Sequence, residues 1–354
     1  MIKQNLVTLA IPTFNRGHRL ARALQQILRE INQYSLNGEI NILISDNNSS
    51  DSTQEVCLKF EELFAISGIN FKVFRNERNL GFSKNVLEAY FRANGSYTLF
   101  LSDDDNLESG FLKQLLLDIK EYKFSVGVYN FCQEPHGVEN LLIKKSCVLS
   151  GESAFEGLSM LVSWPKLSGL VLRNDHKLGR YEEISYLITK ENVVGHVVLA
   201  IEQIGIESTL FLSEVIAAYP DEDFREHVNF VSYIGNYIKR DLELYCDKTG
   251  IGNKKLLQSI DEIPYRNVVH YSLISLSLFY RSKTRLTRAI KLELEGNIIR
   301  FLIRRKLSKS GLILENPFQS LAWTKTALYA LFIASLAVKA RTSRRKLYLM
   351  DEGF

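Results

Sequence analysis

Apolar residues over the first hundred positions alternate between short continuous runs and segments with helical spacing. The runs are typical of parallel strands buried on both faces; they span 6–11, 40–45, 71–74 and 97–101. The segments between them predict amphipathic helices. Two cover 19–34 and 83–93, and the helix between these two has an apolar face of Val56, Phe60, Leu63 and Phe64. Pro12 is expected to end the first strand, and Ser52 with Glu55 to cap the second helix.

Further along, the same patterns are weaker. We expect two more strands, at 125–131 and 168–173, and two more helices, at 154–162 and 193–204. Such alternation implies right-handed crossovers and an α/β fold whose mostly parallel sheet carries helices on both faces. Ligands then gather at the carboxyl ends of the strands. After about Phe224 the pattern is mainly helical, which divides the chain into a domain at 1–220 and a C-terminal helical region at 221–354.

Charge separates the same two parts. The chain of 354 residues is 46% hydrophobic, enough to bury a large core, and its net charge is only +4. Residues 1–224 contain 21 Lys and Arg against 29 Asp and Glu, whereas residues 225–354 contain 23 against 11. For the most basic stretch of the second part, residues 265–346, we weigh a solvated face, an anionic membrane surface and a nucleic-acid patch. Because aromatic residues accompany the cations and no nucleic-acid motif does, we favour the membrane surface and expect no nucleic acid partner.

Cysteine use and hydropathy indicate the compartment. The four cysteines show no metal-ligand spacing, which argues against a zinc site or a disulfide framework and suits a reducing cytosol. A strand pattern begins soon after Met1, so we expect no signal peptide. The longest uncharged apolar stretch, Thr326–Val338, is short for a membrane span. We therefore expect a cytoplasmic protein, peripheral on the inner face of the plasma membrane in the membrane interpretation.

The sharpest chemical feature is Asp103-Asp104-Asp105, directly after an apolar strand. Adjacent carboxylates repel one another, and a divalent cation such as Mg²⁺ or Mn²⁺ relieves that repulsion and can neutralise a departing diphosphate. The alternative is a solvated turn that caps the next helix. Asp46 ends another strand on the same expected edge, where it could accept a hydrogen bond from a nucleobase or a ribose hydroxyl, or could simply form a turn.

Four stretches within about residues 5–112 share one order and spacing. They read AIPTFNR at 10–16, ISDNNSSDST at 44–53, NERNLGFSKN at 76–85 and GSYTLFLSDDD at 95–105. Together they resemble the family 2 glycosyltransferases, whose nucleotide-sugar domain has the GT-A fold and a metal-binding DxD element. Many members carry Asp where Ser102 stands, so the motif is shifted here, and either Asp103 or Asp105 is the second functional carboxylate.

The resemblance implies a role for each matched residue. Asp104 would bind Mn²⁺ or Mg²⁺ and act in catalysis, with Asp105 as the other metal ligand. The remaining matched residues would bind the nucleotide sugar: Pro12, Thr13 and Asp46 at the base, Asp103 at the ribose or diphosphate, and Asn15, Arg16, Asn79, Gly81 and Asn85 around them. The partners expected are a nucleotide-diphosphate sugar and a glycan or lipid-linked glycan acceptor, with a second copy of the chain as a further candidate.

Direct displacement at a sugar carbon also needs a proton acceptor for the incoming hydroxyl. The resemblance places an acidic base at the start of a later helix, and Glu191 is our first candidate; Glu182, Glu183 and His196 follow. Glu191 could instead interact with the helix dipole, and His196 could be a packed core residue. The sequence therefore predicts a metal-assisted, inverting hexosyltransferase of bacterial polysaccharide biosynthesis. A haloacid-dehalogenase-like phosphohydrolase and a non-catalytic carbohydrate-binding protein remain alternatives.

Overall fold

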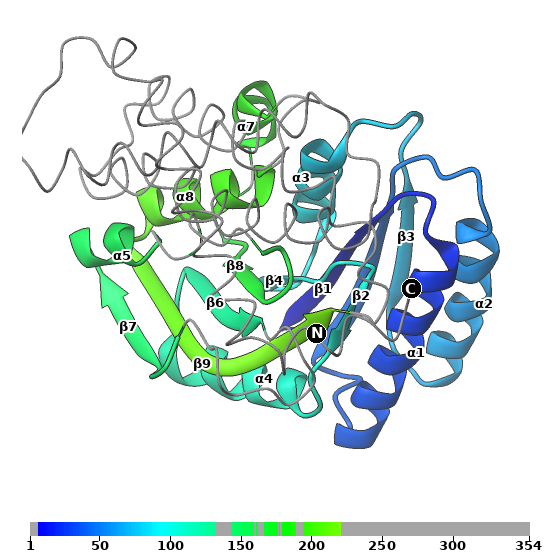
Figure 1. Ribbon diagram of the computed structural model, residues 1–354, viewed down its shortest axis with the longest axis horizontal. Coiled ribbons are helices and arrows are strands. Elements are labelled where there is room, and N and C mark those ends of the chain that lie inside the picture. Colours follow the sequence, from blue (N-terminus) through cyan, green and yellow to red (C-terminus); the bar gives the residue numbers. More distant parts are fainter. Residues whose placement is uncertain are drawn as a thin grey trace, which may run out of the picture. The chain divides into compact units, whose positions relative to one another are not determined.

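The computed structural model describes residues 6–131, 143–158, 161, 166–175, 177, 179–188 and 194–220 (Figure 1). The strands are β1 Val7–Thr13, β2 Ile40–Asp46, β3 Phe71–Arg75, β4 Tyr97–Phe100, β5 Asp105–Leu107, β6 Val126–Phe131, β7 Cys147–Ser150, β8 Leu170–Arg173 and β9 Thr209–Pro220. The helices are α1 Gly17–Tyr34, α2 Thr53–Ile66, α3 Phe82–Arg92, α4 Phe111–Tyr122, α5 Glu152–Gly157, α7 Tyr181–Leu187 and α8 Gly195–Ile206. The predicted helical region at 221–354 and the predicted base Glu191 lie outside the described residues.

These strands form one sheet in the order β3-β2-β1-β4-β8-β6-β9-β5, with β7 paired to β9. β1 runs parallel to both β2 and β4, and β2 runs parallel to β3. Beyond β4 the sheet is mixed, because β8 is antiparallel to its neighbours β4 and β6. The predicted α/β class with a mostly parallel sheet is confirmed. The four strands of the first hundred residues form an all-parallel half, and β6 and β9 also pair in parallel.

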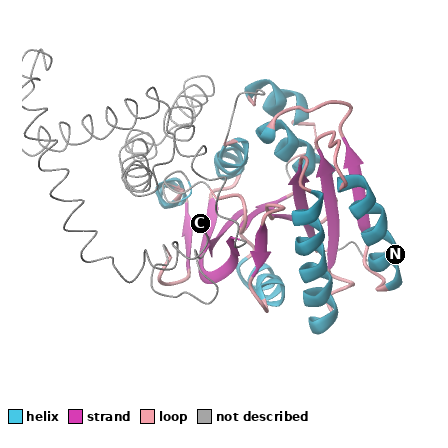
Figure 2. Ribbon diagram, turned by 45° about the vertical axis from the view of Figure 1, so that its right-hand side comes forward, coloured by secondary structure: helices cyan, strands magenta, loops and turns pink. Residues whose placement is uncertain are grey.

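Helices cover both faces of the sheet, as Figure 2 shows. Alternate residues of β1 explain why. Val7, Leu9 and Ile11 pack into the same core cluster as buried residues of α1, α2 and α4. The intervening residues of β1 face the other side, where α3 contacts β1 and β2. All seven residues of β1 and of β2 are buried, which accounts for their nearly continuous apolar sequence.

Two local expectations were wrong. The first strand does not end at Pro12, because β1 continues to Thr13. Pairing with β4 stops at Ala10, so the missing amide hydrogen of Pro12 lies beyond that ladder. The side chain of Ser52 makes no capping hydrogen bond. The Asp51 carboxylate instead accepts from the backbone amide and the hydroxyl of Thr53, at 3.1 and 2.5 Å, and so begins α2.

Candidate functional site

The predicted site residues come together where β1, β2 and β4 end. The strand register places Thr13 opposite Asp46, and the backbone amide of Leu101 bonds the carbonyl of Ala10 as the chain leaves β4. The Thr13 hydroxyl then donates to Asp103 Oδ2 at 2.6 Å, across 90 residues of sequence. The expectation that Asp46 and the acidic triplet share one sheet edge is met by this geometry.

Arginines from the start of α1 contact the first two carboxylates of the triplet. Arg16 Nη1 lies 3.0 Å from Asp103 Oδ1 and 2.9 Å from Asp104 Oδ2. Arg19 Nη1 approaches the same Asp104 oxygen at 3.5 Å. Ser102 donates its hydroxyl hydrogen to the other oxygen of Asp104. Two adjacent carboxylates are therefore balanced by cations of this chain, which offsets their mutual repulsion.

Asp105 has a different set of partners. Its Oδ2 accepts a hydrogen bond from Ser168 at 2.6 Å, and Ser168 Oγ in turn accepts from the amide of Ser102 at 2.9 Å. The partly buried Lys166 interacts electrostatically with Asp105 and also lies over the Phe131 ring, 4.3 Å from its centroid. The backbone of Asp105 belongs to β5, which pairs with β9. Asp105 thus joins the acidic loop to the mixed half of the sheet.

Burial changes the proton affinity of these acids. It raises the pKa of Asp103 to about 6, although Arg16 opposes the shift. Burial, with the Asp104 charge next in importance, raises the pKa of Asp105 to about 7. Burial also lowers the pKa of Lys166, while the charges of Asp105 and Asp104 oppose that shift. The loop after β4 therefore holds charged groups at a cost in free energy, as functional sites often do.

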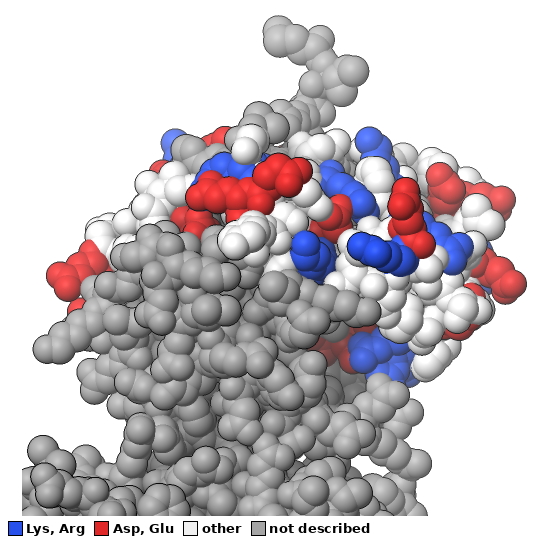
Figure 3. Space-filling view, turned by 90° about the horizontal axis from the view of Figure 1, so that it is seen from above, with Lys and Arg blue, Asp and Glu red and all other residues white. Residues whose placement is uncertain are grey.

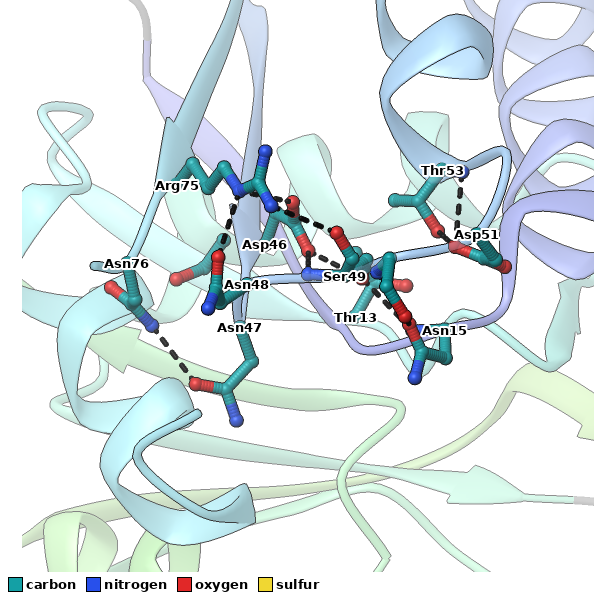
Figure 4. Close-up of polar contacts among 12 residues, drawn as sticks. Thr13, Asn15, Asp46, Asn47, Asn48, Ser49, Asp51, Thr53, Arg75 and Asn76 are labelled. Atoms are coloured by element: carbon teal, nitrogen blue, oxygen red, sulfur yellow. Dashed lines mark hydrogen bonds and ion pairs between the residues drawn. The ribbon is translucent and has the colours of Figure 1, made fainter. Parts of the chain in front are cut away.

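The loop after β2 forms the second part of the site (Figure 4). Asp46 is only 1% exposed, and its Oδ1 accepts from the amide and the hydroxyl of Ser49, at 3.0 and 2.5 Å. Among the described residues, its Oδ2 receives no hydrogen bond. Arg75 Nε, at the end of β3, lies 3.7 Å from that oxygen and donates to Asn48 at 3.1 Å. A buried carboxylate oxygen beside an arginine can accept a hydrogen bond from a ligand N–H group.

Asn15 joins the first loop to the second. Its backbone amide donates to Ser49 Oγ at 2.9 Å, and its side-chain oxygen accepts from the amide of Ser50 at 2.8 Å. Its φ of 53° lies in the left-handed region, which asparagine tolerates better than most residues. The side chain of Asn15 is therefore used in shaping the loop that presents Asp46.

Side-chain amides fix the loop between β3 and α3. Asn47 donates to Asn79 Oδ1 at 2.9 Å and accepts from the amide of Leu80 at 2.9 Å. Asn79 Oδ1 also accepts from the amide of Gly81 at 2.8 Å. Gly81 has a φ of 84°, a conformation that favours glycine. Asn79 and Gly81 thus hold the turn that begins α3.

Asn85 is buried, and both the oxygen and the nitrogen of its side-chain amide are hydrogen-bonded within the protein. Its Oδ1 accepts from the Ser45 hydroxyl at 2.8 Å and from Asn76 Nδ2 at 2.9 Å. Its Nδ2 donates to the carbonyl of Ser45 at 2.9 Å and to that of Thr13 at 3.4 Å. Asn85 therefore connects α3 to the ends of both β1 and β2.

Comparison with known proteins agrees with this geometry. The family model described as Glycosyl transferase family 2 matches residues 8–143, which run from the second residue of β1 past the end of β6 and include every contact of Asp46 and Asp103 described above. Residues 8–143 are a family 2 glycosyltransferase domain.

Curated relatives of this domain are also named as glycosyltransferases. Over 228 residues the chain is 25% identical to GalNAc(5)-diNAcBac-PP-undecaprenol beta-1,3-glucosyltransferase of Campylobacter jejuni, covering 64% of each chain. Over 104 residues it is 36% identical to abequosyltransferase RfbV of Salmonella typhimurium, covering 29% of each. The chain thus spans less than two thirds of the length of either relative.

Solved structures share the fold at low sequence identity. Staphylococcus aureus TarS 1–349 superposes with a TM-score of 0.54 and 16% identity, covering 85% of this chain and 82% of that one. Mannosyltransferase PcManGT from Pyrobaculum calidifontis, in complex with GDP-Man and Mn²⁺, superposes with a TM-score of 0.52 and 12% identity. The match covers 95% of this chain and 87% of that one. These similarities establish the GT-A-like fold of the glycosyltransferase domain.

The candidates for the catalytic base are not brought to this edge by any described contact. Glu182 and Glu183 lie in the first turn of α7, where Glu183 Oε2 is 3.4 Å from Arg180 Nε. His196, on α8, is 2% exposed, and its ring meets that of Phe82 edge-on at 6.1 Å. Glu191 lies outside the described residues. The packing of His196 agrees with its interpretation as a core residue.

Several contacts of the glycosyltransferase domain were missed by the sequence analysis. Arg75 and Arg19 reach the predicted acids, and Asn47 and Asn76 fix the loops around them. A signal existed for Arg75, because it ends an apolar strand just as Asp46 does. Asn47 and Asn76 belong to the quoted stretches, but their buried positions depend on the approach of β3 to β2.

A metal ion of the expected kind fits part of this site. Carboxylate oxygens suit Mg²⁺ and Mn²⁺, and the Asp104 side chain is 19% exposed, against 3% for Asp103. Among the described residues, no group of three or more His, Cys, Asp and Glu is arranged to hold an ion. Mg²⁺ in proteins commonly takes one or two carboxylates and completes its shell with water and substrate phosphates. Asp104 meets that requirement, and Arg16 would have to give way to the ion.

The surface of the described part carries mixed charge. Lys and Arg side chains lie next to Asp and Glu side chains when the molecule is seen from above (Figure 3). Within the described ranges, no helix combines the length and the apolar character that crossing a bilayer requires.

Proposed function

We propose that this protein transfers a sugar from a nucleoside-diphosphate sugar to a lipid-linked glycan during bacterial surface polysaccharide synthesis. The observation that carries the proposal is the pairing of two features on one sheet edge. Asp46 Oδ2 is a buried acceptor that receives no hydrogen bond from a described residue, with Arg75 3.7 Å away, and Asp103 and Asp104 lie on the same edge with their arginines. A base and a diphosphate need these two kinds of site. The undecaprenol diphosphate acceptor named for the Campylobacter relative supports the acceptor class.

The residues divide the work as follows. Asp46 accepts from a base N–H group, while Arg75 donates to a neighbouring base acceptor. Thr13 and Asp103 meet the ribose or the first phosphate. Arg16 and Arg19 supply positive charge where the leaving diphosphate develops negative charge. A bound Mn²⁺ or Mg²⁺, held by Asp104 with Asp105 as the other predicted ligand, would add further neutralisation of that diphosphate.

Inversion at the sugar carbon requires a base beside the acceptor hydroxyl. Glu191 remains our candidate on the resemblance alone, since an acidic base at the start of a later helix is typical of the family. The group would remove the proton as the hydroxyl attacks the face opposite the leaving diphosphate. Glu182 and Glu183, on α7, are the alternatives among the described residues.

The remaining chain has a proposed role as well. We assign residues 1–220 to donor binding and catalysis, and 221–354 to acceptor, membrane-surface or oligomer contacts. The excess of 23 Lys and Arg over 11 Asp and Glu after residue 224 supports attraction to an anionic leaflet. The protein would then work in the cytoplasm, at the inner face of the plasma membrane.

A ligand screen followed by a transfer assay tests the proposal. UDP, GDP and CDP, each with Mn²⁺, Mg²⁺ or EDTA, are screened by thermal shift, because a ligand that binds the folded state raises the melting temperature. The corresponding sugar nucleotides are then incubated with undecaprenyl-diphosphate glycans. We expect one nucleotide to stabilise the protein and its sugar to reach the lipid. Phosphate release without acceptor and without sugar transfer would indicate a phosphohydrolase instead, and binding without either reaction a non-catalytic protein.

A further inference from the structure

We propose that Arg92 is a positioning residue that orients the side-chain amides behind the base-binding edge. The inference rests on the proposed function, because it concerns the pocket that Asp46 and Thr13 form for a nucleobase. Arg92 is the last residue of α3. It touches neither of those two residues, so its influence must pass through others.

The first step is the contact of Arg92 with Asn76. Arg92 Nη1 donates to Asn76 Oδ1 at 3.0 Å, while the same guanidinium lies 5.3 Å from the centroid of the Phe74 ring. Its Nη2 is 2.7 Å from Glu88 Oε2, one turn earlier on α3. The Tyr181 hydroxyl donates to the other oxygen of Glu88. The guanidinium is thereby fixed on several sides.

The second step follows from the asymmetry of an amide. Asn76 is 4% exposed, and its Nδ2 donates to Asn47 Oδ1 at 3.2 Å and to Asn85 Oδ1 at 2.9 Å. If the amide turned over, its NH₂ group would face the Arg92 cation, and its oxygen would face two other oxygens. A donor at Arg92 therefore selects one orientation of Asn76, and Asn76 in turn selects one orientation of Asn47 and of Asn85.

The third step reaches the pocket itself. With its oxygen turned to Asn76, Asn85 directs Nδ2 to the carbonyls of Ser45 and Thr13. Asn47 follows Asp46 directly in the chain, and the backbone N–H of Asn76 donates to the backbone carbonyl of Asp46 at 2.8 Å. One guanidinium thus sets the hydrogen-bond direction of amides that hold the ends of β1 and β2. Losing it should allow these ends to relax, and the pocket should read a base less well.

Binding measurements with matched variants test this assignment. Arg92→Met removes the donor, Arg92→Lys keeps a cation, and Asn76→Asp keeps an acceptor for Arg92 but cannot donate to Asn47 and Asn85. Lys120→Met is the control, because Lys120 is also the basic residue of a last helical turn and pairs with a glutamate, Glu39, at 3.2 Å. Calorimetry compares UDP, GDP and CDP with inorganic pyrophosphate, all with Mn²⁺, because pyrophosphate has no base.

We expect Arg92→Met and Asn76→Asp to weaken the tightest nucleotide about tenfold, since each removes buried hydrogen bonds. Pyrophosphate binding should not change, Arg92→Lys should fall in between, and Lys120→Met should match wild type. Unchanged nucleotide affinity in Arg92→Met, or an equal loss for pyrophosphate, would overturn the assignment.

A second measurement separates this inference from the proposed function. Side-chain amide NMR signals of Asn47 and Asn85 should be protected from hydrogen exchange in wild type and exposed in Arg92→Met, with no nucleotide present. Failure of wild type to bind any nucleotide would sink the proposed function. Unchanged protection in the variant would sink the role of Arg92, whatever the ligand.

Discussion

The loops after β2 and β3 and the loop after β4 lie at one edge of the sheet, but their side chains are held in different ways. Asp46 accepts hydrogen bonds from the neutral amide and hydroxyl of Ser49, with the Arg75 guanidinium 3.7 Å from its other oxygen. The side-chain amides behind it bond mostly to other amides, hydroxyls and backbone, with Arg92 as a charged donor to Asn76. Around Asp103 the partners are charged, and burial raises the pKa of the acid to about 6. This mostly neutral network, here called the neutral loop, has its side-chain amides fully hydrogen-bonded and resists change, whereas the competing charges around Asp103, the charged loop, can exchange partners when a ligand arrives.

The largest effect is expected at the charged loop. Asp104→Asn removes the carboxylate of Asp104, which is more exposed than that of Asp103, and keeps the size of the side chain. Sugar transfer should fall ~100-fold or more, because the variant loses the carboxylate that would hold the metal ion, and that ion would neutralise the departing diphosphate. Initial rates with the sugar nucleotide found in the screen measure this. Asp175→Asn, an exposed surface change, is the control. Full activity of Asp104→Asn would remove Asp104 from the catalytic site.

Next in size is the neutral loop. Asp46→Asn keeps one acceptor for Ser49 but can turn an NH₂ group toward the base N–H. Donor affinity should fall ~10- to 100-fold, as for loss of a hydrogen bond to a charged group. Donor binding should still be tighter with Mn²⁺ than with EDTA, because Asp104 is unchanged. Titration calorimetry checks both. Asp51→Asn should lower stability at the α2 start without this loss of affinity, and equal losses in the two variants would contradict the base-binding role.

Sequence patterns predicted the half of the molecule that continuous apolar strands define. The parallel strands, the helices between them and the shared edge of Asp46 and Asp103 followed from periodicity and strand-end rules. β5 was not predictable, because Asp105-Asn106-Leu107 has no strand pattern and owes its conformation to pairing with β9. The capping residue of α2 was predicted wrongly because two adjacent polar residues, Asp51 and Ser52, could both accept a hydrogen bond from the first turn of the helix. Arg16 bonds Asp103 across 87 residues, and such a contact depends on the folded loop.

Stability should also depend on pH through the charged loop. The pKa of Asp103 is raised from 3.8 to about 6 in the folded protein. The folded state therefore holds the proton more tightly, and the contribution of this group to stability falls as the pH rises from about 4 to about 6. Asp103→Asn should be more stable than wild type by on the order of 1–3 kcal/mol at pH 7.5, and by much less at pH 4.5.

Urea unfolding in EDTA at the two pH values measures this difference, since the other titrating groups largely cancel between wild type and variant. Asp46→Asn serves as the comparison from the neutral loop. An advantage of Asp103→Asn that is the same at both pH values would mean that Arg16 compensates the buried charge fully. The contrast between the loops would then rest on geometry alone.

The smallest expected effect concerns Arg16, which shares Asp104 with any metal ion. Its Nη1 lies 3.0 Å from Asp103 and 2.9 Å from Asp104, and a cation that binds Asp104 must replace the second contact. Arg16→Gln should therefore tighten Mn²⁺ binding ~3- to 10-fold, the scale of a partly exposed ion pair. Titration of Mn²⁺ by electron paramagnetic resonance, without nucleotide, measures this directly. Arg29→Gln, further along α1, controls for the general loss of positive charge. Transfer should nevertheless slow in Arg16→Gln, because the same guanidinium is proposed to meet the diphosphate. Weaker Mn²⁺ binding in the variant would show that Arg16 supports the ion site, and the exchange of partners proposed for the charged loop would be wrong.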